Sequence, residues 1–135
     1  MIDDNRYGLD ARRAVLEGGG YSVATALGGA AGLELFSQDD FDLVVTDYRM
    51  PEVNGPKVVQ GVRAVDSEVP IIILSGFVRD LGLTPEEAGV DAVLTKGPAE
   101  SDDLLRTVAR LTKPKPSRSR RSSADAAPRA RKASA

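Results

Sequence analysis

The chain has 135 residues and a formal net charge of −2, and it contains neither cysteine nor histidine. This composition excludes disulfides and thiolate metal sites, and it removes the commonest general base. Any bound metal must therefore be a hard cation with oxygen ligands, such as Mg²⁺. Because no apolar run reaches the length of a membrane span and the N-terminus has no signal pattern, we expect a soluble cytoplasmic protein with no membrane partner.

Charge divides the chain into two regions. Residues 113–135 hold eight of the 18 basic residues and one acidic residue, a net charge of +7. Residues 1–112 carry ten basic and nineteen acidic residues, a net charge of −9. Since the C-terminal region also lacks branched and aromatic apolar side chains, we expect one domain over 1–112 and a disordered basic tail over 113–135. The tail either attracts nucleic acid, an acidic partner or the acidic domain itself, or only aids solubility.

Strand-like and helix-like segments alternate along the first 112 residues. The runs 43–46 and 71–74 are continuously apolar, as expected of parallel strands that are buried on both faces. Alternation of this kind predicts an α/β fold, with helices on both faces of a parallel sheet. In chain order, the patterns predict a helix over 6–17, a strand over 21–26, a helix over 30–37, a strand over 43–46, a helix over 56–64, a strand over 71–74, a very short helix starting near 84, a strand over 92–95 and a helix over 101–111.

Polar side chains stand where the apolar segments end. Asp3 and Asp4 follow the first segment, Asp47 follows 43–46, Ser75 follows 71–74 and Lys96 follows 92–95. The carboxyl ends of parallel strands meet at one edge, which is where doubly wound folds bind ligands. An isolated strand-end aspartate is more often a turn former. Three close carboxylates would instead recruit a divalent cation, a lysine and a hydroxyl suit phosphate oxygens, and an aspartate can attack phosphorus.

These groups accompany the motif Asp-x-x-Met-Pro-x-x-Asn-Gly, which begins at Asp47. With them, residues 1–112 resemble the receiver domain of bacterial two-component response regulators, the CheY-like family. The resemblance implies a (βα)5 flavodoxin-like fold, a doubly wound parallel sheet with strand order 2-1-3-4-5. It also implies a Mg²⁺-dependent phosphorelay in which Asp47 accepts phosphate from a sensor histidine kinase or a phosphotransfer protein.

The resemblance assigns roles to individual residues. Ser75 and Lys96 would act on the phosphoryl group. Asp4, the carboxylate of Asp47 and the backbone carbonyl of Arg49 would bind Mg²⁺ directly, and Asp3 would act mostly through a water.

Three positions depart from the family pattern. Only Met1 and Ile2 precede the acidic pair where the family has a full central strand, so we expect a truncated first strand. Either the strand is a stub, or the true start lies upstream, which we favour and in which case we expect a less stable chain and a poorly held acidic pair. Val93 stands where the family has a switching aromatic residue. Gly97, inserted between the lysine and the following proline, would alter how the lysine is aimed.

Three functions fit this pattern to different degrees. The leading hypothesis is a stand-alone receiver that is phosphorylated on Asp47 and signals by contact with a downstream protein, without being a separate enzyme. The alternative is a pseudo-receiver that serves as a docking module and is not phosphorylated. An aspartate-based phosphatase lacks support, because such an enzyme needs a second acid two residues after the nucleophile and this chain has Arg49 there.

Overall fold

A single parallel sheet forms the centre of the computed structural model, which describes residues 1–76 and 82–112. The strand order β2-β1-β3-β4-β5 confirms the predicted (βα)5 topology. The predicted disordered tail lies outside the described residues. The strands are β1 (Ile2–Asp3), β2 (Ala26–Leu27), β3 (Val44–Asp47), β4 (Ile71–Ser75) and β5 (Ala92–Thr95).

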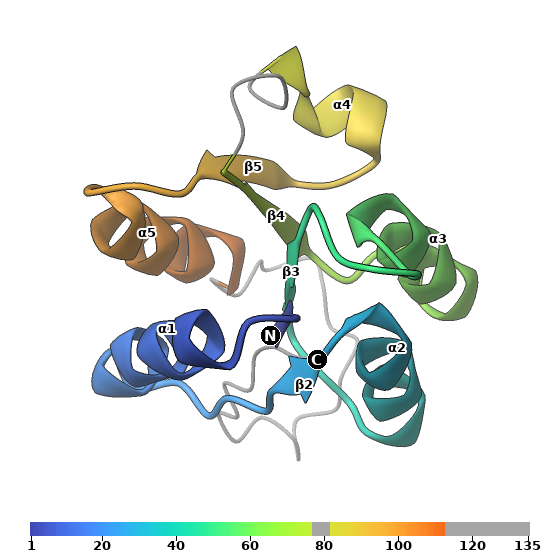
Figure 1. The fold of residues 1–135 in the computed structure, drawn as a ribbon, viewed down its shortest axis with the longest axis horizontal. Coiled ribbons are helices and arrows are strands. Elements are labelled where there is room, and N and C mark those ends of the chain that lie inside the picture. Colours follow the sequence, from blue (N-terminus) through green and yellow to red (C-terminus); the bar gives the residue numbers. More distant parts are fainter. Residues whose placement is uncertain (77–81, 113–135) are drawn as a thin grey trace.

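Helices cover both faces of the sheet, as the alternating pattern predicts. Figure 1 shows α1 and α5 on one face and α2 and α3 on the other, with α4 beyond β5. The helices are α1 (Arg6–Gly18), α2 (Gly29–Gln38), α3 (Gly55–Val65), α4 (Pro85–Ala88) and α5 (Glu100–Thr112). Across the described ranges 1–76 and 82–112, no helix combines the length and apolarity that crossing a membrane would require.

Two apolar clusters, one on each face of the sheet, form the core. Side chains alternate along β4, so that Ile71 and Ile73 join the cluster under α2 and α3, while Ile72 and Leu74 join the cluster under α1 and α5. All four are almost completely buried. This double burial explains why the strand has a continuous apolar sequence rather than an alternating one.

The short first strand still occupies the centre of the sheet. Ile2 pairs with Ala26 of β2 and with Thr46 of β3, and the Met1 ammonium group donates a 2.9 Å hydrogen bond to the Ala24 carbonyl. The first strand therefore has only two residues, as the sequence led us to expect. The strand predicted over 21–26 is shorter and later than expected, because β2 forms a ladder with β1 only at Ala26–Leu27, opposite its two residues.

Side-chain caps fix the helix starts that border the carboxyl edge of the sheet. The Asn5 side chain accepts from the backbone N–H groups of Tyr7 and Gly8 at the start of α1. Asn54 caps α3 in the same way. The predicted Thr84 cap is also present, and α4 has only four residues. Since an N-cap accepts hydrogen bonds from otherwise unpaired N–H groups, Asn5 and Asn54 fix the residues at which α1 and α3 begin.

Candidate phosphoacceptor and cation site

Asp47, the last residue of β3, lies at the carboxyl edge of the sheet with its side chain largely buried. Its Oδ1 atom lies 2.7 Å from Lys96 Nζ and also accepts a 3.1 Å hydrogen bond from the Tyr48 backbone N–H. Lys96 therefore reaches Asp47 despite the inserted Gly97, whose φ of 158° is a conformation that residues with side chains rarely adopt. The Asp47 carboxylate at the end of β3 and the Lys96 ammonium just after β5 therefore form an ion pair.

Burial raises the pKa of Asp47 above its usual range, against the opposing influence of Lys96. The nearby carboxylate of Asp3 adds to the rise. Both causes follow from the geometry, since desolvation and a neighbouring negative charge each disfavour the ionised form. A positively charged ligand at this carboxylate would therefore relieve an existing electrostatic strain.

The loop after Asp47 folds tightly over the end of β3 because of Gly55. A Cβ atom added there would lie 2.8 Å from the Asp47 carbonyl oxygen and 2.9 Å from the Tyr48 Cα, closer than real Cβ contacts. The Gly55 N–H in turn donates to the Tyr48 carbonyl at 2.9 Å. The Asn-Gly pair of the sequence motif thus closes the loop that surrounds the phosphoacceptor candidate and starts α3.

Asp3 is held firmly, contrary to the expectation that the truncated first strand would leave it loose. Because Ile2 pairs with Thr46, Asp3 and Asp47 follow as neighbours at the sheet edge. Asp3 Oδ1 accepts from the Asn5 N–H at 3.1 Å, and Oδ2 lies 2.6 Å from an Arg12 Nη atom. The expectation was wrong because it considered strand pairing alone and not side-chain anchors.

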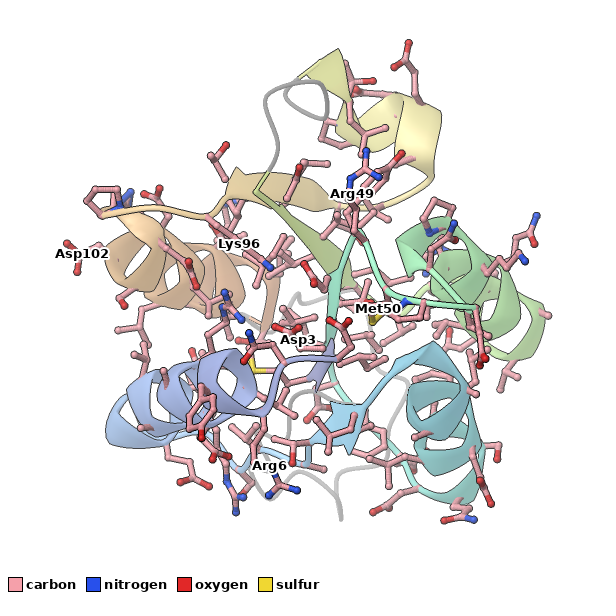
Figure 2. The ribbon with its side chains drawn as sticks, in the orientation of Figure 1. Asp3, Arg6, Arg49, Met50, Lys96 and Asp102 are labelled. Carbon is pink, nitrogen blue, oxygen red and sulfur yellow. The ribbon has the colours of Figure 1, made fainter. Side chains whose placement is uncertain are left out.

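The second acid of the pair, Asp4, is exposed. It nevertheless completes a group of three carboxylates, since one oxygen each from Asp3, Asp4 and Asp47 lies within 4.8 Å of the others. These acids, with Asn5, Arg49, Gly76 and Lys96, line a cleft of about 260 Å³. Figure 2 shows Asp3 and Lys96 directed toward this central region, whereas Arg49 extends toward the α4 side. The guanidinium of Arg49 lies 5.9 Å from the centre of the Tyr48 ring.

Ser75 lies beside the cleft but does not line it. In the alternation along β4, Ser75 follows Ile73 and so faces the α2–α3 side, whereas Asp47 follows Val45 toward the α1–α5 side. The Ser75 side chain is 1% exposed, and its Oγ is a buried atom with no hydrogen-bond partner among residues 1–76 and 82–112. An unpaired buried hydroxyl is uncommon in folded proteins and calls for an explanation, of which a catalytic role is one.

The other departures also have structural consequences. Val93, which stands where the resemblance implies a switching aromatic residue, is half-buried and packs against the cluster under α2 and α3. Gly76 lies next to Lys96, because Ser75 pairs with Thr95 one step earlier. A Cβ atom at Gly76 would lie 3.2 Å from Lys96 Cδ. The lysine stem therefore runs directly over the backbone of this glycine.

Sequence reasoning missed two residues of the site, Arg12 and Glu100. Arg12 bonds both Asp3 and Glu100, the first residue of α5. Arg12 precedes another arginine on a predicted helix, a pattern typical of a solvent-exposed face. One signal in the sequence was Gly8, a residue that disfavours helix, one turn before Arg12. The structure explains this glycine, because a Cβ there would lie 2.9 Å from the Arg12 guanidinium.

A second, larger hollow of about 460 Å³ lies away from these groups, between α1, β2 and α2. Its lining includes Arg6, Asp10 and Glu34 as well as apolar side chains. It contains none of the predicted site residues. The smaller cleft is therefore the functional candidate, because it gathers the carboxylates and the lysine at the carboxyl edge of the sheet.

Known proteins share this sequence pattern and fold. The family model described as the response regulator receiver domain matches residues 1–109. The transcriptional regulatory protein GlrR of Escherichia coli is 34% identical over 110 residues, which are 80% of this chain and 24% of that protein. The probable transcriptional regulator ycf27 of Guillardia theta is 41% identical over 119 residues, covering 83% of this chain and 45% of that protein. The chain thus spans less than half the length of these relatives.

A solved structure has the same architecture. The response regulator TrrA from Thermotoga maritima, in complex with Mg²⁺-BeF, superposes with a TM-score of 0.74 and 26% identity. The match covers 82% of this chain and 94% of that one.

Proposed function

This chain belongs to the response regulator receiver domain family of two-component systems, and from that premise we propose that it accepts a phosphoryl group on Asp47. The observation that supports this most strongly is the position of Asp47, buried at a strand end, paired with Lys96 at 2.7 Å and adjacent to two further acids. The donor is a phosphohistidine of a sensor histidine kinase or a phosphotransfer protein.

The transfer is a substitution at phosphorus. An oxygen of the Asp47 carboxylate forms a bond to phosphorus while the bond from phosphorus to the histidine nitrogen breaks. The electron pair of that bond stays on the imidazole, and the product on this chain is an aspartyl phosphate. Lys96 supplies a fixed positive charge for a phosphoryl oxygen, and Ser75 donates its hydroxyl hydrogen after turning from its buried position. The chain therefore catalyses its own modification and is not otherwise an enzyme.

The carboxylate cluster fits the Mg²⁺ that this family implies. Its donors are hard oxygen atoms within 4.8 Å of one another. The chain has no cysteine or histidine, which are the ligands that softer metals prefer. Asp4, Asp47 and the backbone carbonyl of Arg49 would hold the ion, with Asp3 mostly through a water. When bound, Mg²⁺ neutralises negative charge on the carboxylates and the phosphoryl oxygens.

Signal output would come from the receiver itself. We propose a stand-alone receiver that acts by contact with a downstream protein in the cytoplasm. An antibody against residues 1–112 should detect a species of 14.3 kDa in cells that express the natural gene. A larger natural species would contradict the stand-alone part alone.

The basic tail is proposed to add weak contacts to nucleic acid or to an acidic partner, because it carries a net charge of +7. Nucleic-acid binding that persists after deletion of residues 113–135 would remove this role.

One alternative has specific support. A pseudo-receiver docks partners without phosphorylation, and both the Val93 substitution and the four-residue α4 favour it, since both depart from the usual switching face. The two functions differ in a single measurable property, which is phosphate uptake at Asp47.

Intact mass after incubation with acetyl phosphate and Mg²⁺ distinguishes these functions. We expect a phosphate-sized mass gain in wild type, no gain in Asp47→Ala, and full gain in the matched control Asp102→Asn, an exposed acid on α5 that points away from the cleft (Figure 2). No gain in wild type, or an equal gain in Asp47→Ala, would contradict phosphorylation and favour the pseudo-receiver.

A further inference from the structure

Arg12 links the acidic cleft to α5 through two ion pairs. An Nη atom lies 2.6 Å from Asp3 Oδ2, and Nε donates to a carboxylate oxygen of Glu100. The Arg12 side chain is only 13% exposed, and those of Asp3 and Glu100 are 4% and 16% exposed. Screening by water is weak at such burial, so these charges act strongly on each other and on their neighbours.

The fold makes room for this arginine. Gly8 lies one helical turn before Arg12 on α1, and a Cβ at Gly8 would lie 2.9 Å from the guanidinium and 3.4 Å from Asp3 Oδ2. Burial works to lower the pKa of Arg12, but Glu100, Asp3 and Asp47 together raise it. The guanidinium is therefore a permanent cation held against the acidic cluster by packing as well as by charge.

We propose that Arg12 is a built-in counter-cation that sets the Mg²⁺ affinity of the site, by neutralising Asp3 and competing with the bound ion. This proposal rests on the proposed function, because it concerns the cation that assists phosphoryl transfer. Mg²⁺ brings two positive charges to carboxylates that Arg12 already partly neutralises. Arg12 therefore weakens Mg²⁺ binding, and it stabilises the metal-free fold by covering a buried carboxylate.

Glu100 has the opposite influence on the same equilibrium. It engages the Arg12 Nε atom and so offsets part of the positive charge beside Asp3. Without Glu100, that charge would act undiminished on the cleft, and Mg²⁺ would bind less tightly. Two substitutions on one ion-pair chain are therefore expected to move Mg²⁺ affinity in opposite directions.

Titration calorimetry with MgCl₂ tests the first substitution, Arg12→Met, which keeps an apolar stem and removes the charge. We expect the Mg²⁺ Kd to fall roughly tenfold, an effect between that of a charge pair in bulk water and that of one near a protein surface. We also expect a larger Mg²⁺-induced rise in Tm than in wild type, because the ion now covers an otherwise unpaired Asp3. Arg13→Met is the matched control, since Arg13 pairs with Glu17 on the exposed face of α1, and its Kd should equal that of wild type.

Glu100→Gln keeps the proposal testable even if Arg12→Met fails to fold. We expect it to weaken Mg²⁺ binding a few-fold, whereas Asp103→Asn, at an exposed position on the same helix, should not. An unchanged or higher Kd in folded Arg12→Met, an unchanged or lower Kd in Glu100→Gln, or no Mg²⁺ binding by wild type would overturn the proposal.

These outcomes are separate from the test of phosphorylation. If Asp47 takes up phosphate but the Kd values do not move as stated, the role of Arg12 fails alone. If the Kd values move as stated but Asp47 takes up no phosphate, the proposed function fails and the role of Arg12 stands.

Discussion

The two ends of the parallel sheet both carry an arginine and an aspartate, but they use these charges differently. At the amino end, Arg63 donates to the carbonyls of Val69 and Gly89, at 2.6 and 3.3 Å, and lies 3.4 Å from Asp91. Asp91 Oδ2 in turn accepts from the Ile71 N–H at 2.9 Å. Each charge there satisfies backbone groups of the fold and ties α3 to the starts of β4 and β5.

At the carboxyl end, carboxylates gather closely around Asp47 and a buried hydroxyl has no partner within the described ranges. Such an arrangement does not maximise stability, since close like charges and unpaired polar atoms both destabilise a fold. The difference indicates that the amino end is built for stability and the carboxyl end for a ligand. Substitutions at the two ends should therefore have separable effects on folding and on phosphate uptake.

The largest expected effect is on chemistry at the carboxyl end. Lys96→Met should slow phosphate uptake from acetyl phosphate by roughly 100-fold, because it removes the fixed charge beside the transferring group. The rate of mass gain measures this, and Lys57→Met, at an exposed position on α3, should leave it unchanged. A near-normal rate in Lys96→Met would contradict the assigned role of the lysine.

At the amino end, the expected effect is on stability. Arg63→Ala should lower the free energy of unfolding by about 2 kcal/mol, because it leaves a buried carbonyl without its charged donor. Urea unfolding measures the loss, and phosphate uptake by the folded fraction should be unchanged. Arg106→Ala serves as the control, since its ion pair with Asp103 is exposed and should contribute little. Reduced uptake by folded Arg63→Ala would mean that the two ends are coupled.

Ser75→Ala should change stability and chemistry in opposite directions. Removing a buried unpaired hydroxyl should raise the free energy of unfolding by up to about 1 kcal/mol, while phosphate uptake slows. In Ser37→Ala the same change removes a hydroxyl that already donates to the Glu34 carbonyl at 2.7 Å, so no gain is expected. A destabilised Ser75→Ala would indicate that the hydroxyl has a partner in solution.

The smallest expected effect is a pH-dependent one at Asp47. Its pKa is raised in the folded state, mainly by burial, so the folded protein binds a proton more tightly than the unfolded chain. Stability is therefore lost as the pH rises from the unfolded pKa, about 3.9, through the raised folded pKa. Asp47→Asn should be more stable than wild type at neutral pH without Mg²⁺, and the difference should shrink as the pH falls toward 4. Thermal unfolding at several pH values measures this difference, and a constant difference would contradict the raised pKa.

The sequence predicted most of the fold because the elements rest on local patterns. The apolar runs over 43–46 and 71–74 and the Thr84 cap appear in the structure almost as expected. The β2 strand was placed wrongly, because its length depends on pairing with β1, a distant and unusually short partner. Hydrophobic patterns describe one segment at a time and carry no register between two segments.

The site residues at the ends of strands could be predicted from the sequence, whereas the side-chain contacts that join two helices could not. Asp47 and Lys96 were identified because parallel strands end at one edge. The contact between Arg12 and Glu100 joins α1 to α5 across 88 positions of the chain, and no periodicity reports it. The burial of Arg12 depends on the missing side chain of Gly8, and a helical glycine by itself does not say which side chain fills the space beside it.

The most direct test of phosphate chemistry at Asp47 is to locate the modified residue. Protein treated with acetyl phosphate and Mg²⁺ can be reduced with borohydride, which converts an aspartyl phosphate to homoserine, and then mapped by peptide mass spectrometry. We predict homoserine at position 47 and aspartate at positions 3 and 4. Unmodified aspartate at position 47, or homoserine at position 3 or 4 instead, would contradict the account.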